Sequence, residues 1–491
     1  MSTAAREPVG VPDPERVPGV VTGRSTARGA LWTVLAETSQ RLAQTLCFFL
    51  LAAVLSPKQF GLAAVAFLMV QIVNSLTYAG LGPAVQALGP DAARDRTVVG
   101  MALCCGCLGA AVMALSAGPV CAALGAPDAR HLVQLVGLSL PLTQLAEVTG
   151  ALLDRDLRFS ETALAQVLGS ASSTVVGVTA ALAGAGATAL ILQTVVQQGV
   201  RAGILLLRRP GTLRMALHRR QAEELWGVGR DLLTTSVLVT AYGNLDNATV
   251  GAVSGPTLLG GYAFVYNLTN LPYFLIGLAA NRVVLPTYKR LQLAGQPLGT
   301  AYETAVRAAA SISALPLGFL AVAGPDAVDV LFGAKWHDVY APLRLLCVFA
   351  WVRTVAATSG PVLIALGRTP TQRRVQELQL LAMLVLVVPA TMLAGPLGTA
   401  AAVTIPMLVG AGLLVKLSAR LTGAKFVAVA GRVGEALLLG LLAGAAGWLG
   451  FQAAAGPLGL FTGLVGATTV WAVVVVVALP AELRRLLRRS F

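Results

Sequence analysis

Long apolar runs recur along nearly the whole chain, and they constrain the fold more than any other feature. Each run is close to the ~20 residues that a helix needs to cross the hydrocarbon core of a bilayer. Charged residues make up only 12% of the chain, against about 25% in a soluble globular domain. The sequence therefore predicts an all-α polytopic membrane protein with about 14 transmembrane helices. The predicted spans are 29–55, 60–86, 97–124, 130–152, 160–184, 187–207, 226–252, 257–287, 302–332, 339–366, 375–394, 397–418, 427–451 and 457–480.

The distribution of basic residues predicts the orientation of these spans. Of the 36 lysines and arginines, 27 fall in connections and tails on one predicted side, and three, Lys58, Arg130 and Lys335, fall on the other. Because basic connections stay in the cytoplasm, we expect a multi-pass protein of the bacterial plasma (inner) membrane with both termini cytoplasmic. The net charge of +14 then marks the cytoplasmic face and does not indicate nucleic-acid binding.

The widest basic connector lies between spans six and seven and divides the chain. Parallel halves are a common plan of transporters, and Ser56–Gly61 and Ser254–Gly260 are weakly similar entries to spans two and eight. The predicted segments are a disordered cytoplasmic tail (1–23), an N-terminal six-helix bundle (24–207), a basic cytoplasmic connector (208–224), a C-terminal six-helix bundle (225–420), two additional transmembrane helices (421–480) and a basic cytoplasmic tail (481–491).

Polar side chains form stripes inside spans one, two, seven and eight, whereas spans thirteen and fourteen have nearly apolar centres. A charge at mid-bilayer costs about 2.5–3.5 kcal/mol, so it usually faces a partner or a cavity. Each polar residue taken singly could be an inter-helix hydrogen bond, and Glu37 and Arg41 could pair with each other at i, i+4. The clustering of the stripes favours a hydrated central cavity between two halves.

Arginine dominates the candidate lining of that cavity. The guanidinium group presents a rigid, permanently charged fork that suits phosphate, so an anionic cargo such as a lipid-borne pyrophosphate is expected. The predicted substrate-binding residues are Arg41, Arg230, Arg282, Arg353, Gln44, Asn74, Asn244, Asn267 and Asn270. The candidates for binding a coupling ion are Glu37, Asp231 and Asp246.

The sequence gives little support to catalysis, and we expect no cofactor and no metal. None of the three histidines lies in a stripe with a candidate nucleophile, and no phosphate-binding GxxxxGK[ST] motif is present. The six cysteines lie in apolar runs, where they suit helix packing better than metal binding.

Several short motifs together resemble the polysaccharide transporters of the multidrug/oligosaccharidyl-lipid/polysaccharide flippase superfamily. The resemblance covers roughly residues 24–420. Its motifs are Gly29–Trp32, Leu55–Gly61, Leu153–Phe159, Asn244–Asp246, Leu259–Tyr262, Tyr266–Leu268, Leu271–Pro272 and Val284–Pro286. It implies two six-helix bundles around a V-shaped cationic lumen and, as cargo, an undecaprenyl-pyrophosphate-linked oligosaccharide. Alternating access, coupled to an ion such as Na⁺ or H⁺, would move this cargo from the cytoplasmic to the outer leaflet.

The resemblance also implies partners, namely membrane lipids and the glycosyltransferases and polymerase of the same pathway. The chain departs from the family pattern at Thr249, after which small residues replace bulkier aliphatic ones. Asp246 is therefore either a coupling-ion site or a structural partner of a lumen arginine. The alternatives are a lipid II flippase, a drug/cation antiporter, which should have an acidic lumen, and a non-transporting scaffold of a polysaccharide export system.

Overall fold

The computed structural model describes residues 40, 43–45, 47–77, 80–213, 216–279, 284–453 and 456–478. Within these ranges the chain is helical apart from short connections. Ten of the described helical stretches are long and apolar enough to cross a membrane. The predicted all-α polytopic fold is confirmed.

The first part of the chain forms a group of mostly long helices. A shorter apolar helix covers Ala43–Val54. It is followed by α2 (Pro57–Thr77), α3 (Leu81–Ala87), α4 (Ala92–Ala123), η2 (Pro127–Ala129), α5 (Arg130–Gly137), α6 (Ser139–Arg155), α7 (Phe159–Leu182), α8 (Ala187–Arg208) and η3 (Pro210–Leu213).

The second part begins with the longest helix. It consists of α9 (Arg219–Ala279), α10 (Leu285–Leu293), α11 (Gly299–Phe332), η5 (Ala334–Val339), α12 (Tyr340–Ala357), α13 (Ser359–Ala365), α14 (Thr369–Thr422), α15 (Phe426–Gln452) and α16 (Gly456–Ala478).

Two of these helices are bent, and each covers two of the predicted spans. In α9 the bend is at Gly255, with φ 80°, and in α14 it is at Gly395, with φ 56°. A proline follows each glycine, and proline restricts the residue before it, while glycine tolerates positive φ. With the two bent helices divided in this way, the described part of each predicted apolar run is helical; most of the first run, 29–55, lies outside the described residues.

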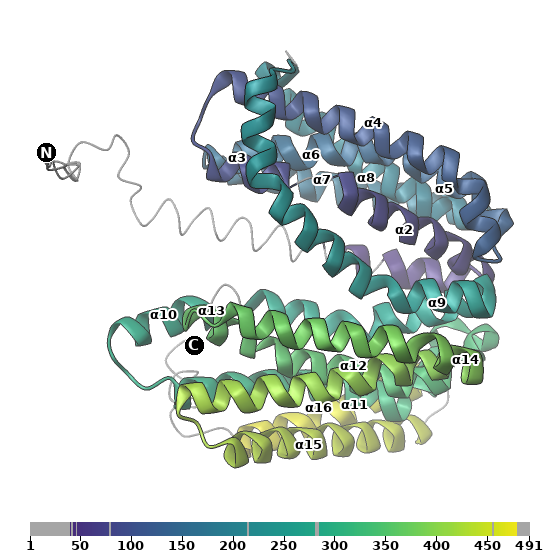
Figure 1. Ribbon diagram of the computed structural model, residues 1–491. Helices are drawn as coiled ribbons and strands as arrows, with labels where there is room; N and C mark the ends of the chain where they lie inside the picture. The colour runs from purple at the N-terminus through teal and green to yellow at the C-terminus, as the bar shows by residue number, and fades with distance from the viewer. Residues whose placement is uncertain are drawn as a thin grey trace, which may run out of the picture.

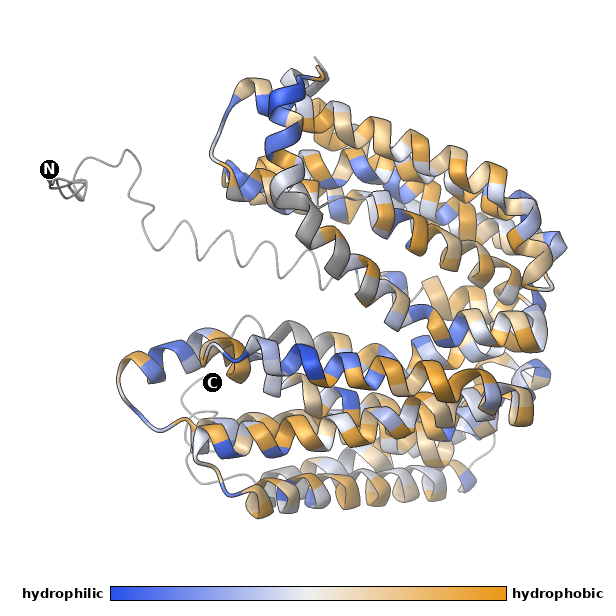
Figure 2. Ribbon diagram, in the orientation of Figure 1, coloured by the Kyte–Doolittle hydropathy of each residue, from blue (hydrophilic) through white to orange (hydrophobic). Residues whose placement is uncertain are grey.

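The helices form two groups (Figure 1). Helices α2–α8 lie in one and α10–α16 in the other, with α9 leading from the first to the second. The ribbons converge near the bend of α9 and separate toward α3 and α10 (Figure 1). Figure 2 shows apolar residues along most of the helices and hydrophilic ones near the start of α9 and in α10.

Backbone contacts join the two groups where they converge. A Cβ atom added to Gly61 of α2 would lie 1.6 Å from the carbonyl oxygen of Pro256, and one added to Gly260 would lie 1.9 Å from that of Pro57. Only glycine allows helices to approach this closely. Any side chain at Gly61 or Gly260 would force the two groups apart.

Aromatic rings fill the same junction. The Phe264 ring lies 4.3 Å from the Trp336 ring and 5.6 Å from the Phe48 ring, measured between centroids. The Lys335 ammonium group donates hydrogen bonds to the carbonyl oxygens of Ala53 (2.7 Å) and Leu55 (2.8 Å). The joined end is thus the one that carries Lys335, which the charge pattern predicts to be outside.

Helices α15 and α16 lie beside α11 at the edge of the second group. A Cβ atom on Gly318 would lie 2.1 Å from the Gly440 carbonyl oxygen, and one on Gly463 would lie 2.6 Å from that of Gly447. The outer faces of α14–α16 carry exposed apolar side chains, among them Leu393 (87%) and Val427 (82%). Such faces suit contact with lipid.

Candidate functional site

Arg353 on α12 lies among aromatic and amide side chains of α9. Its Nη1 donates hydrogen bonds of 3.1 Å to the Tyr266 hydroxyl and to Oδ1 of Asn270. Its guanidinium carbon lies 4.0 Å from the centroid of the Tyr273 ring, a distance at which the ring face attracts a cation. No carboxylate of the described residues forms an ion pair with Arg353, so its charge is stabilised without being neutralised.

The amide of Asn270 has a fixed orientation in this cluster. Its Nδ2 donates a 2.7 Å hydrogen bond to the Tyr266 carbonyl oxygen one helical turn earlier, which leaves Oδ1 facing the guanidinium group. Asn270 is buried, with 1% of its surface exposed. Arg353 and Asn270, predicted separately as substrate-binding residues, are thus neighbours.

Asp246 lies on α9 before the Gly255 bend and is buried, with 2% of its surface exposed. One carboxylate oxygen accepts a hydrogen bond from the Tyr262 hydroxyl (3.0 Å), and the other accepts one from the backbone N–H of Asn247 (2.8 Å). The rings of Tyr262 and Tyr266 are stacked, with centroids 6.2 Å apart. The carboxylate is therefore linked to the arginine cluster through two tyrosines.

Amide side chains connect α9 to the first group of helices. Nδ2 of Asn244 donates a 3.2 Å hydrogen bond to Oε1 of Gln71 on α2. One turn further along α2, Asn74 accepts a 3.0 Å hydrogen bond from Nε2 of Gln144 on α6. Asn74 and Asn244 thus belong to a set of amides that joins α2 to α6 and to α9.

The other predicted site residues make no contact with Arg353 among the described residues, or they lie outside the residues that the structure describes. Gln44 is half-buried, and Asn267 is exposed and bonds to the carbonyl oxygen of Ala263 in its own helix. The spacing of Asn267 and Asn270 predicts one face, but the structure gives them different surroundings. Glu37, Arg41, Arg282 and the side chains of Arg230 and Asp231 lie outside the described residues.

Several residues that make these contacts were not predicted as site residues from the sequence. Tyr262 and Tyr266 are one helical turn apart, a spacing that places them on one face and that could have indicated a cluster. Tyr273 and Gln144 could not be identified without knowing their neighbours. The same applies to Glu147, which forms a 2.6 Å ion pair with Arg201 between α6 and α8.

Comparison with known proteins finds similarity to proteins of polysaccharide biosynthesis. Residues 50–341 match the family described as polysaccharide biosynthesis protein. The succinoglycan biosynthesis transport protein ExoT of Rhizobium meliloti is 26% identical over 355 residues, which cover 71% of each chain. The lipopolysaccharide biosynthesis protein WzxC of Escherichia coli is 22% identical over 394 residues, which cover 78% of each chain.

Solved structures share the fold. The lipid II flippase MurJ in an inward closed conformation superimposes with a TM-score of 0.72 at 13% identity, covering 90% of this chain and 97% of that one. An inward-facing multidrug resistance transporter of the MATE family, in the MOP superfamily, superimposes with a TM-score of 0.63 at 16% identity. The match covers 80% of this chain and 96% of that one. The fold is therefore that of a multi-pass membrane transporter, and the homologues are transporters, not enzymes.

Proposed function

This chain belongs to the polysaccharide biosynthesis protein family, and from that premise we propose a specific flippase activity. The protein moves an oligosaccharide linked to undecaprenyl pyrophosphate from the cytoplasmic to the outer leaflet of the bacterial plasma membrane. Both termini face the cytoplasm, and the halves 24–207 and 225–420 alternate in exposing the cargo to the two sides. Glycosyltransferases supply the cargo, and a polymerase consumes it.

The observation that carries this proposal is the uncompensated charge of Arg353. Its Nη1 is bonded to Tyr266 and Asn270, while Nη2 and Nε make no hydrogen bond to the described residues. These free N–H groups suit the oxygens of a phosphate. A pyrophosphate at this position neutralises a cation that forms no ion pair with the described residues, and unpaired charge inside a membrane protein is costly.

The amides complement this charge in binding the sugar. Gln71 is exposed and Asn74 half-buried, and an amide offers two donors and one acceptor oxygen. Such groups match the mixed donors and acceptors of sugar hydroxyls and carry no charge. Similarity to ExoT and WzxC favours an oligosaccharide cargo. Similarity to the solved structures concerns the fold alone.

Asp246 is the proposed site for the coupling ion, Na⁺ or H⁺. Its buried carboxylate lies beside the Tyr262 hydroxyl, and Oδ1 of the adjacent Asn247 is buried with no hydrogen-bond partner among the described residues. Oxygen ligands of this kind suit a small hard cation. The contact from Asp246 to Tyr262, and the stacking of Tyr262 on Tyr266, connect this site to Arg353.

The experiment is a flipping assay in liposomes with a fluorescent undecaprenyl-pyrophosphate oligosaccharide and a membrane-impermeant quencher. The wild-type protein is expected to make inner-leaflet cargo accessible, whereas the Arg353→Ala variant is slow. The matched control is Arg373→Ala, which removes an exposed arginine paired with Glu377. Equal rates for wild type and Arg353→Ala would contradict the proposed role of Arg353, and no flipping by the wild type under any ion gradient would contradict the function.

A further inference from the structure

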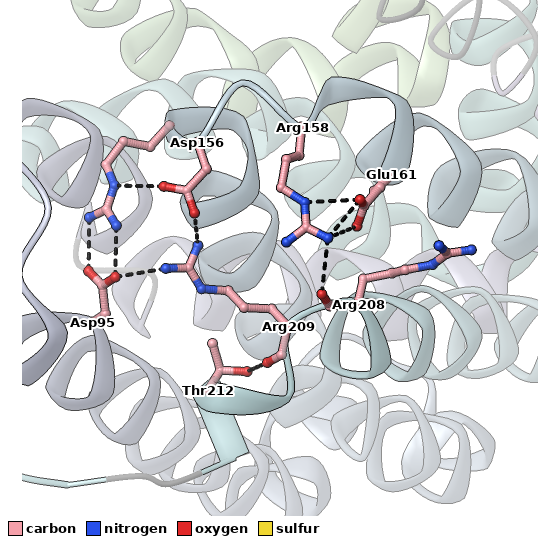
Figure 3. Close-up of polar contacts among 8 residues, drawn as sticks. Asp95, Asp156, Arg158, Glu161, Arg208, Arg209 and Thr212 are labelled. Atoms are coloured by element: carbon pink, nitrogen blue, oxygen red, sulfur yellow. Dashed lines mark hydrogen bonds and ion pairs between the residues drawn. The ribbon is translucent and has the colours of Figure 1, made fainter. Parts of the chain in front are cut away.

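A network of ion pairs lies at the end of the first helix group where η3 and the connector begin (Figure 3). Asp95, in the first turn of α4, accepts two parallel hydrogen bonds from Arg155 of α6, at 2.8 and 2.7 Å. Arg209, just after α8, donates to the same carboxylate at 2.9 Å and also bonds to Asp156. Parallel pairs from a guanidinium fork are among the strong hydrogen bonds in proteins.

The central charges of this network are shielded from solvent. The side chains of Arg155, Asp95 and Arg209 expose only 10%, 12% and 20% of their surface. Exposed ion pairs contribute about 0–1 kcal/mol, but removing one partner of a buried pair costs about 3–5 kcal/mol. The burial makes this network a structural element and distinguishes it from ordinary surface charge.

The backbone between the charged residues is held in an unfavourable conformation. Leu157 has φ 61° and is the one residue other than glycine with positive φ in the described ranges. The left-handed region costs roughly 1–2 kcal/mol for such a residue. On either side of it, Asp156 bonds to Arg209, while Arg158 bonds to Glu161 (2.7 Å) and to the carbonyl oxygen of Arg208 (3.3 Å). The turn thus directs both neighbours onto the end of α8 and the start of the connector.

The rest of the described connector lies on the same helix group. The backbone N–H of Ala216 donates to the Arg96 carbonyl oxygen, and that of His218 donates to the Thr97 hydroxyl, both at 3.4 Å. A Cβ atom on Gly100 would lie 2.9 Å from the Ala216 carbonyl oxygen. The connector therefore touches α4 at Ala216 and His218.

The start of α9 is anchored to α4 as well. Glu224 forms a 3.0 Å ion pair with Arg94, and Leu225 is fully buried in a cluster with residues of α3, α4 and α6. The α4 terminus itself is capped by Asp91, whose carboxylate accepts hydrogen bonds from the N–H groups of Arg94 and Ala93, and these bonds lower the pKa of that carboxyl. Contacts thus hold the connector at both ends and in its middle.

We infer that Asp95, Arg155, Asp156 and Arg209 form a clamp that fixes connector 208–224 to the N-terminal helix group, so that the connector and the first turn of α9 move with that group during transport. The motif Leu153–Phe159 contains two of these residues and the strained Leu157, which gives the motif a mechanical role. The inference rests on the movement of two halves in the proposed function, but not on the chemistry of the cargo.

The clamp is tested first by hydrogen exchange on the full-length protein in nanodiscs, which needs no cargo. Arg209→Ala and Asp95→Asn are expected to speed amide exchange in 210–224 by roughly tenfold or more, the factor that corresponds to about 1.4 kcal/mol. Arg373→Ala, which breaks an exposed pair in α14, is the matched control and leaves this exchange unchanged. Wild-type exchange rates in the two clamp variants would overturn the proposal.

Movement with the N-terminal group is tested by cross-linking. In a variant lacking the six native cysteines, Thr97→Cys and His218→Cys are joined by a short, reducible dithiol cross-linker, because the 3.4 Å contact there involves the backbone N–H of His218 and not its side chain. The cross-linked protein is expected to flip cargo within about twofold of the same sample after reduction, since the joined parts never separate. A block that reduction relieves would show that the connector detaches and overturn the inference. Failure of the reduced sample to flip would count against the proposed function, and the exchange experiment would still decide on the clamp.

Discussion

Two half-buried arginines have opposite surroundings. Arg155, at the end of α6, is bonded by both terminal nitrogens to Asp95 and lies 3.5 Å from Asp156. Arg353, inside α12, contacts two tyrosines and an asparagine and no carboxylate of the described residues. The positive charge is compensated in the first cluster and left available in the second.

The difference separates structural charge from functional charge. A charge with a fixed counter-ion stabilises the arrangement of the helices that carry it, and its removal leaves the partner unpaired. A charge held by hydroxyl groups and a ring face can accept an anionic ligand, because nothing anionic has to be displaced. Substitutions in the Arg155 cluster should therefore affect stability, and substitutions in the Arg353 cluster should affect transport.

The largest expected effect is on stability, from Asp95→Asn. The variant leaves Arg155 and Arg209 without their shared counter-ion, and we expect unfolding free energy to fall by about 3 kcal/mol or more. Denaturant unfolding in detergent micelles measures this. Glu377→Gln, which affects an exposed pair, should change it by less than about 0.5 kcal/mol. Similar losses in both variants would remove the distinction between clamp and surface charge.

The next effect is on transport, from Arg353→Ala. The loss of charged hydrogen bonds worth about 1.5–3 kcal/mol should slow flipping by about tenfold to a hundredfold. Because no carboxylate of the described residues forms an ion pair with Arg353, the unfolding free energy should fall much less than in Asp95→Asn. A variant that flips normally but unfolds easily would reverse the roles assigned to the two arginines.

Arg353→Lys sharpens the same comparison. Lysine keeps the charge but lacks the planar fork that binds two oxygens at once, so flipping should be intermediate, within about tenfold of the wild type. The measurement is the liposome assay. If lysine were as poor as alanine, hydrogen-bond geometry alone would account for the effect; if it were as good as arginine, the fork would be irrelevant.

The smallest effect is expected from Tyr266→Phe. This change removes one neutral partner of Arg353 and costs about 1 kcal/mol, so flipping should slow by roughly fivefold, with the aromatic packing retained. Tyr340→Phe, which removes a hydroxyl that is bonded to Asp329 at the first residue of α12 and makes no contact with Arg353 among the described residues, is the control for loss of a tyrosine hydroxyl. Equal slowing in the two variants would mean that Tyr266 does not act through Arg353.

The sequence predicted the helical spans, because apolar runs reflect burial in lipid, and within the described residues these runs are helical. Asn270 in span eight and Arg353 in span ten were proposed from the sequence as substrate-binding residues, and the structure brings them into contact. Their contact could not be predicted, because 83 residues separate them and no local pattern records which helices become neighbours.

The ion pairs of the clamp could not be predicted from the sequence either. Arg155 and Asp95 are 60 residues apart, and Arg209 and Asp95 are 114 apart, so their pairing depends on how α4, α6 and α8 pack. The basic residues of these connections predict the cytoplasmic face as a pattern of charge, but a charge count does not distinguish a solvated arginine from a clamped one. Tyr262 and Tyr273 were overlooked because a tyrosine in an apolar run reads as ordinary packing.

The most direct test of the central claim is a binding measurement that isolates the phosphate charge. Purified protein in nanodiscs is titrated with undecaprenyl pyrophosphate and with undecaprenol, for the wild type, Arg353→Ala and the control Arg373→Ala. We predict that wild type and control prefer the pyrophosphate by at least about tenfold, a difference of roughly 1.4 kcal/mol, and that Arg353→Ala loses the preference. An undiminished preference in Arg353→Ala would contradict the account.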